Sequence, residues 1–156
     1  VPDELIEQIL EAGRTAPVGC NLGAVRFVVL RTPEEKNMIW SDISTDNAVI
    51  IVLCFDKRVS ETVGQDKTVP QNLGYDAAAA GDHMLLMAHA LGLGGVWLSK
   101  TAKSDHTEDT GKMFKELYGL PDYIEVAMHI AVGWPASGII KSKRPALSDM
   151  IIKKPF

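Results

Sequence analysis

The sequence has little cysteine and none of the short motifs that mark the common catalytic sites. Its two cysteines, Cys20 and Cys54, stand too far apart for a CxxC pair, which argues against a disulfide framework or a zinc ribbon and favours a reduced, cytoplasmic setting. No Gly-x-Ser-x-Gly, Walker-type or paired-carboxylate pattern is present. The four histidines have no partners at metal-ligand spacing, so we expect no metal site. No signal-peptide pattern opens the chain.

Positive charge is scarce except near the end of the chain. The 156 residues include 16 Lys and Arg against 20 Asp and Glu, a net charge of −4. Residues 136–156 alone carry +4, so the first 135 residues carry −8. Such an acidic body argues against nucleic acid as a partner. The basic end fits either a local anion site or a solvated terminus, and charge alone does not decide between them.

Hydrophobic periodicity predicts helices and strands in alternation along one domain, residues 1–156. Residues 48–55 are apolar on both faces, so this strand should be central in its sheet. Residues 57–71 are polar and predict an irregular loop. The predicted helices cover residues 3–15, 72–91 and 108–118, with another beginning at Thr32-Pro33, and the predicted strands cover 25–30, 48–55, 94–99 and 124–134. Together they predict an α+β sandwich.

The longest predicted element is the helix over residues 72–91, which is apolar nearly all round and ends at Gly92. Asp76, Asp82, His83 and His89 interrupt it, which argues against a membrane span. A helix with almost no polar face belongs in a core or at a subunit interface. In a chain of this length we expect it to serve as both.

Three short segments are candidate binding sites, each with an ordinary structural alternative. Asn21 lies in the loop 16–23 and either forms a turn or offers an amide to a planar heterocycle. The cluster of Lys141, Lys143 and Arg144 either holds a phosphate or is solvated. Residues 92–97 partly match a dinucleotide fingerprint, but they leave a helix to enter a strand, so a helix C-cap and turn explain them better.

Three segments, taken in order, resemble the nitroreductase family of FMN-dependent oxidoreductases. The first segment comprises residues 10–21 and 26–29 and contains the loop Ala16-Pro-Val-Gly-Cys-Asn21. The second, residues 76–97, is similar to the family's long central helix and the Gly-Leu-Gly that follows it. The third comprises residues 117–121, 130–135 and 141–145, which are similar to a helix end, the last strand and the basic tail. The chain begins where the family's arginine-rich segment would end, so we expect that segment to be missing. Val18 and Gly23–Val25 replace the family's serine and Gln-Pro-Trp.

The resemblance implies a nitroreductase-like α/β sandwich that is an obligate homodimer through its long central helices, with two FMN molecules in the interface. Asn21 would then bond the edge of the flavin ring, and Pro17, Val18 and Gly19 would line that ring. The segment passing beside flavin N5, O4 and N3 would be Trp97, Leu98, Ser99 and Lys100. The cations at the FMN phosphate would be Lys141, Lys143 and Arg144.

The resemblance also implies an enzyme, a flavoprotein of the NAD(P)H-dependent nitroreductase type. It would pass electrons from NADH or NADPH to flat, electron-poor small molecules (nitroaromatics, quinones or activated alkenes) by a ping-pong mechanism. The flavin, not a side chain, would carry the electrons, which accounts for the lack of a catalytic constellation. Two alternatives stay open: a flavin-consuming, dehalogenating or dehydrogenating member of the same superfamily, and a non-catalytic flavin-binding module.

Overall fold

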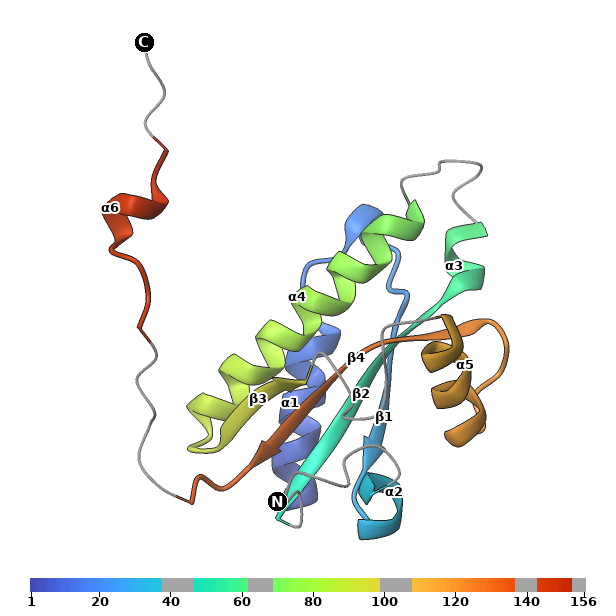
Figure 1. The fold of residues 1–156 in the computed structure, drawn as a ribbon, viewed down its shortest axis with the longest axis horizontal. Helices are drawn as coiled ribbons and strands as arrows, with labels where there is room; N and C mark the ends of the chain where they lie inside the picture. The colour runs from blue at the N-terminus through green and yellow to red at the C-terminus, as the bar shows by residue number, and fades with distance from the viewer. Residues whose placement is uncertain (38–46, 62–68, 99–107, 137–142, 153–156) are drawn as a thin grey trace.

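A four-stranded antiparallel sheet forms the centre of the molecule (Figure 1). The computed structural model describes residues 1–37, 47–61, 69–98, 108–136 and 143–152. In spatial order the strands are β1 (Val25–Leu30), β2 (Ala48–Asp56), β4 (Ile124–Gly133) and β3 (Gly94–Leu98). All neighbouring strands run antiparallel, so β1 and β3 are the edges of the described sheet.

Helices cover both faces of this sheet. On one face lie α1 (Asp3–Arg14) and α4 (Val69–Ala90), which contribute Ile9 and Met84 to the larger apolar cluster. On the other face lies α5 (Glu108–Leu117), which contributes Phe114 to a second cluster. The shorter elements are η1 (Gly19–Asn21), α2 (Pro33–Asn37), α3 (Lys57–Glu61) and α6 (Leu147–Met150). The predicted α+β sandwich is therefore confirmed.

The central position predicted for the strand 48–55 is confirmed by β2. Its residues from Val49 to Cys54 are all buried. Successive side chains of a strand point to opposite faces, so Ile51 joins the cluster under α1 and α4 while Val52 joins the one under α5. A strand covered on both faces requires the continuous apolar run that the sequence contains.

The long helix α4 begins at Val69, three residues before its predicted start, and ends at Ala90. Gly92 follows with a φ of 78°, a left-handed conformation that glycine adopts without strain. The N–H of Leu93 donates to the carbonyl of Ala88 at 2.9 Å and closes the last turn, as the predicted C-cap requires. Midway along the helix, a Cβ on Gly81 would stand 2.8 Å from the ring of Trp97, so glycine lets β3 approach α4 closely.

The prediction of an irregular loop over residues 57–71 is wrong at both of its ends. Lys57–Glu61 form α3, and the first residues of α4 occupy the other end, while residues 62–68 lie outside the described chain. The N–H of Arg58 donates to Oδ1 of Asp56 at 3.1 Å, so Asp56 caps α3. This cap is a local contact that hydrophobic periodicity cannot reveal.

The other predicted elements agree with the structure to within one residue at their described ends. Thr32 caps α2 as predicted: its N–H donates to Oε2 of Glu35 at 2.9 Å, and its hydroxyl accepts from the Glu35 N–H at 3.3 Å. Among the described residues, no helix is long and apolar enough to cross a membrane.

His129 of β4 is a buried imidazole on the α5 side of the sheet. It is 5% exposed, and its ring centroid lies 4.8 Å from that of Phe114. Its Nε2 is 3.2 Å from the hydroxyl oxygen of Tyr118, within hydrogen-bond distance. Burial lowers the pKa of His129 to about 4, because a charged imidazolium would lose its hydration there.

We expect the protein to lose stability as the pH falls from about 6.5 to about 4, by up to about 3 kcal/mol from this residue. As the pH falls, His129 is protonated near pH 6.5 in the unfolded chain but only near pH 4 in the folded chain. The unfolded state therefore holds more protons throughout this window. Urea unfolding of the wild type and of His129→Gln, at neutral pH and near pH 4, measures the difference. An equally large loss in the variant would contradict the assignment.

Candidate functional site

The loop between α1 and β1 contains the only two described residues with side chains that adopt a left-handed backbone. Cys20 has a φ of 51° and Asn21, the next residue, a φ of 56°. A residue with a Cβ adopts this conformation at a cost of roughly 1–2 kcal/mol, somewhat less for asparagine. Two such residues in succession need support from the rest of the fold. Strained backbone of this kind gathers at functional sites.

A buried carboxylate of α4 supports this loop from one side. The Gly19 N–H donates to Oδ1 of Asp76 at 2.8 Å, across 57 positions of sequence. Asp76 is only 5% exposed. Its second oxygen, Oδ2, is buried and accepts no hydrogen bond within the described part of the chain. Buried acceptors are nearly always satisfied in folded proteins, so Oδ2 marks a place where a donor is expected.

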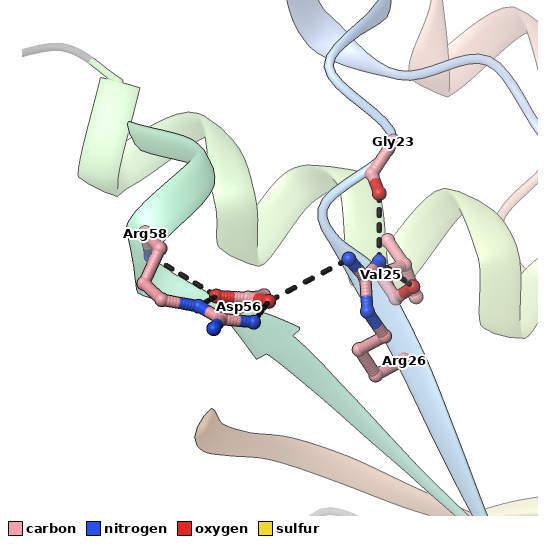
Figure 2. A network of polar contacts seen from close by, with 5 residues as sticks. All are labelled: Gly23, Val25, Arg26, Asp56 and Arg58. Carbon is pink, nitrogen blue, oxygen red and sulfur yellow. Dashed lines mark hydrogen bonds and ion pairs between the residues drawn. The ribbon is translucent and has the colours of Figure 1, made fainter. Parts of the chain in front are cut away.

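A second carboxylate, Asp56, lies at the far end of the loop and is neutralised by two arginines (Figure 2). Its oxygens accept from Nε and Nη2 of Arg58 at 2.9 and 2.7 Å, and Nη2 of Arg26 lies 3.6 Å away. The guanidinium of Arg58 also stacks 3.6 Å above the ring of Tyr123. The hydrogen bonds from Arg58 hold the pKa of Asp56 below its usual value.

Arg26 connects this ion pair to the end of the loop. Figure 2 shows its Nη1 directed at the carbonyls of Gly23 and Val25, to which it donates at 2.8 and 2.9 Å. The N–H of Asp56 donates to the carbonyl of Ala24 at 2.9 Å. The loop is thus held near its start by α4 and at its end by β2.

The structure brings four of the predicted site residues together in this loop. Pro17, Val18, Gly19 and Asn21 follow one another there, with Pro17 and Asn21 exposed and the other two half-buried. Asp76 fixes the backbone of the loop near its start, and Asp56 and Arg26 fix it at its end. The exposed amide of Asn21 can therefore donate and accept hydrogen bonds at a fixed position.

A second group, Trp97 and Leu98, lies on β3. Trp97 is 37% exposed and packs its ring on Gly81 of α4, whereas Leu98 is buried on the opposite face of the sheet, in the cluster under α5. Asp76 and Gly81 are five residues apart on α4, about 7.5 Å along the helix axis. The helix α4 therefore positions both the loop and Trp97. Ser99, Lys100 and Lys141 lie outside the described residues.

The two described tail cations are not brought to the loop of their own chain. Lys143 and Arg144 are exposed, and the tail segment 143–152 runs apart from the sheet and its helices in Figure 1. Leu147 in its short helix α6 and Ile152 beyond that helix are 73% and 92% exposed. No group of His, Cys, Asp and Glu among the described residues could hold a metal ion.

Sequence reasoning did not find the two carboxylates that hold the loop. Asp76 was visible only as a polar interruption of an apolar helix, although a lone charge in such a helix signals a buried partner. Asp56, Arg26 and Arg58 carry no such signal, because Arg26 lies within β1, Asp56 is the last residue of β2 and Arg58 lies in the short helix α3. Their association depends on the pairing of β1 with β2.

Comparison with known proteins gives a consistent set of sequence relatives. The model of the family described as "Nitroreductase family" matches residues 1–77 and 49–134. A protein of Archaeoglobus fulgidus named "Putative NADH dehydrogenase/NAD(P)H nitroreductase" is 30% identical over 141 residues, which cover 86% of this chain and 75% of that protein. A protein of Methanothermobacter thermautotrophicus with the same name is 28% identical over 141 residues, 87% of this chain and 68% of its own.

Solved structures with the same fold include two with comparable sequence identity. One, from Desulfovibrio desulfuricans, is described as "a putative nitroreductase in complex with FMN"; it is 30% identical, covers 100% of this chain and 87% of its own, and has a TM-score of 0.76. The other, a "Putative NADH Oxidase" from Clostridium acetobutylicum, is 28% identical, covers 100% and 90%, and has a TM-score of 0.79.

We expect Asp56→Ala to lower the free energy of unfolding at neutral pH by about 2 kcal/mol, because two arginines lose a buried, charged acceptor. Since the folded pKa of Asp56 lies below its unfolded value, this contribution is full near pH 7 and is lost as the pH falls through the folded pKa. Urea unfolding measures it. Asp122→Ala is the matched control, since Asp122 is exposed and, within the described residues, only its carbonyl accepts a hydrogen bond, from Lys115. Equal stability of the two variants would refute this role.

Proposed function

The chain belongs to the nitroreductase family, and on that basis we propose that it is an FMN-dependent oxidoreductase that passes electrons from NAD(P)H to flat, electron-poor acceptors. Nitroaromatics, quinones and activated alkenes are the acceptor class. The observation that carries the proposal is the loop 17–21, which is held in a strained conformation beside α4 and exposes the amide of Asn21. The names of the relatives supply the donor and the cofactor: NAD(P)H in the archaeal proteins and FMN in the Desulfovibrio structure.

The residues of the loop fit an FMN molecule. A flavin ring edge alternates hydrogen-bond donors and acceptors, which an exposed asparagine amide can match. The buried Oδ2 of Asp76 still lacks a donor within the described chain, and FMN carries donors on its ring and on its ribityl chain. We propose that Asn21 would bond the edge of the flavin ring, that Pro17, Val18 and Gly19 would line that ring, and that the segment Trp97, Leu98, Ser99 and Lys100 would pass beside it.

Lys143 and Arg144 are proposed, with Lys141, to hold the phosphate. Both cations are exposed and form no ion pair with another described residue, so their charge is available to an anion. Because the tail runs apart from its own loop in Figure 1, we propose that its cations reach the FMN bound by the loop of a second copy of the chain. The proposal therefore includes a homodimer in which each FMN touches both chains.

Exposed apolar side chains on α4 and β3 support that homodimer. Tyr75 and Leu86 of α4 are 73% and 61% exposed, and Val96 of the edge strand β3 is 53% exposed. Tyr75 and Leu86 are eleven residues, about three turns, apart and so lie on one face of α4. An exposed apolar face of this kind marks an interaction site. The exposed tail adds Leu147, Met150, Ile151 and Ile152. We also propose a cytoplasmic location, which the two unpaired thiols support.

Bound FMN supplies a hydride acceptor that later releases its electrons, chemistry that no side chain provides. The chain's part is to bind and orient: the loop fixes the ring, and the partly exposed Trp97 borders the site. The donor and the acceptor are flat molecules that use one binding place in turn. The nucleotide product leaves before the acceptor binds, which is a ping-pong mechanism.

We expect the purified protein to be yellow, and Lys143→Glu to weaken FMN binding at least tenfold, about 1.4 kcal/mol, because a phosphate cation becomes an anion. Titration of the FMN-free protein measures the affinity. Lys112→Glu is the matched control, since it changes the net charge equally at an exposed position of α5. Equal affinity of the two variants would show that the tail does not hold the phosphate. A wild-type protein that stays colourless after FMN is added would overturn the proposed function.

We expect the wild type to be a dimer in analytical ultracentrifugation, and Leu86→Glu to weaken the dimer at least a hundredfold. An interface with two-fold symmetry loses two leucines, each worth about 1.5 kcal/mol or more. Gln8→Glu is the control, because it adds the same charge on an exposed position of α1. A monomeric wild type, or equal dimer affinity in both variants, would contradict this interface.

A further inference from the structure

We propose that Asp76 is a positioning residue, which holds the loop 17–21 in the conformation that presents Asn21 and the loop backbone to FMN. The inference rests on the proposed function and adds to it a residue that acts through the loop. Nothing in the sequence pattern of the loop itself selects Asp76. Asp76 is selected instead by its burial, by its contact with Gly19 and by the left-handed backbone of the two residues that follow Gly19.

The loop does not hold its own conformation well. Within η1 the Asn21 N–H donates to the carbonyl of Val18 at 3.3 Å, and the Leu22 N–H donates to that of Gly19 at 3.2 Å. Both distances are at or beyond the long end of the range for such bonds, so the bonds are weak. They must keep Cys20 and Asn21 in a backbone conformation that side chains disfavour. A stronger contact from outside the loop is therefore needed.

The contact with Asp76 meets that need. At 2.8 Å it is shorter than either bond within η1, and its acceptor is a carboxylate, which makes it stronger than a bond between neutral groups. It fixes the N–H of Gly19, the residue immediately before Cys20. Asp76 in turn lies on a long helix packed against the sheet, so its position is set by the core. The core thus determines the backbone path of the loop.

The two carboxylates that hold the loop differ in their partners, and the difference indicates that Asp56 stabilises the fold whereas Asp76 positions the loop. Asp56 is satisfied by Arg26 and Arg58, as expected of a group that stabilises the fold. Within the described chain Asp76 has no cation partner, and its Oδ2 is buried without a hydrogen bond. A buried carboxylate left in this state disfavours folding. We therefore infer that the role of Asp76 is to hold the conformation of the loop and not to stabilise the fold.

Three variants test this inference. Asp76→Ala removes the acceptor for the Gly19 N–H, Asp76→Asn keeps one oxygen as an acceptor, and Asp82→Ala removes an exposed carboxylate from the same helix as the control. In the protein without FMN, hydrogen–deuterium exchange reports on peptides covering residues 16–24. We expect exchange at least tenfold faster in Asp76→Ala, nearly unchanged exchange in Asp76→Asn, and no change in Asp82→Ala. Peptides from β2 should exchange as in the wild type in all three.

FMN titration of the same proteins supplies the second readout. We expect the affinity to fall at least tenfold in Asp76→Ala and less than threefold in Asp76→Asn. In an Asn21→Ala background, Asp76→Ala should cause a smaller further loss of affinity than in the wild type, because one of the groups that the loop presents is already absent. A purely structural role would speed exchange in the loop and in β2 alike and leave the affinity of the folded protein unchanged, and that result would overturn the inference.

Different results would refute the proposed function and the positioning role of Asp76. If the wild type does not bind FMN, the proposed function is wrong and this inference falls with it. If the wild type binds FMN and Asp76→Ala binds it equally well, only the inference is wrong. Unchanged exchange of the loop in Asp76→Ala would also refute it, whatever the affinity.

Discussion

The structure depends on one helix, α4, that is apolar nearly all round and yet carries a buried carboxylate. Its apolar residues, such as Met84, form the cluster with α1 and the sheet, and Gly81 lets Trp97 of β3 lie against it. Its single buried acid, Asp76, reaches the loop 17–21 through the N–H of Gly19. An apolar helix can therefore set the geometry of a polar site, because the rigidity of its packing is passed on through one short hydrogen bond.

The two buried acids near the loop illustrate two uses of charge. Asp56 is bound by Arg58 and faced by Arg26, and its lowered pKa shows that its ionised form is favoured in the fold. Asp76 has one donor and one unsatisfied oxygen. The first arrangement stabilises the junction of β1, β2 and the loop. The second leaves one carboxylate oxygen without a hydrogen-bond donor in the described chain, as is common where a ligand completes a site.

The sequence predicted the elements that hydrophobic periodicity controls, and the resemblance predicted the family. Strand 25–30 and the helix cap at Gly92 are confirmed as predicted, because apolar repeats and glycine act locally. The helix α3 was missed, because its cap by Asp56 is a single hydrogen bond with no periodic signature. Asp76 was missed because its partner, Gly19, lies 57 residues away and the contact exists only after folding. The assignments of Asn21 and the tail cations stay predictions.

In the proposed function, FMN held by the loop would accept electrons from a nicotinamide nucleotide before any acceptor is present. The most direct measurement is an anaerobic titration of the FMN-loaded protein with NADH and, separately, with NADPH. We predict that at least one nucleotide abolishes the yellow absorbance band with no acceptor present, and that a quinone then restores it. A bound flavin that neither nucleotide reduces would contradict the account.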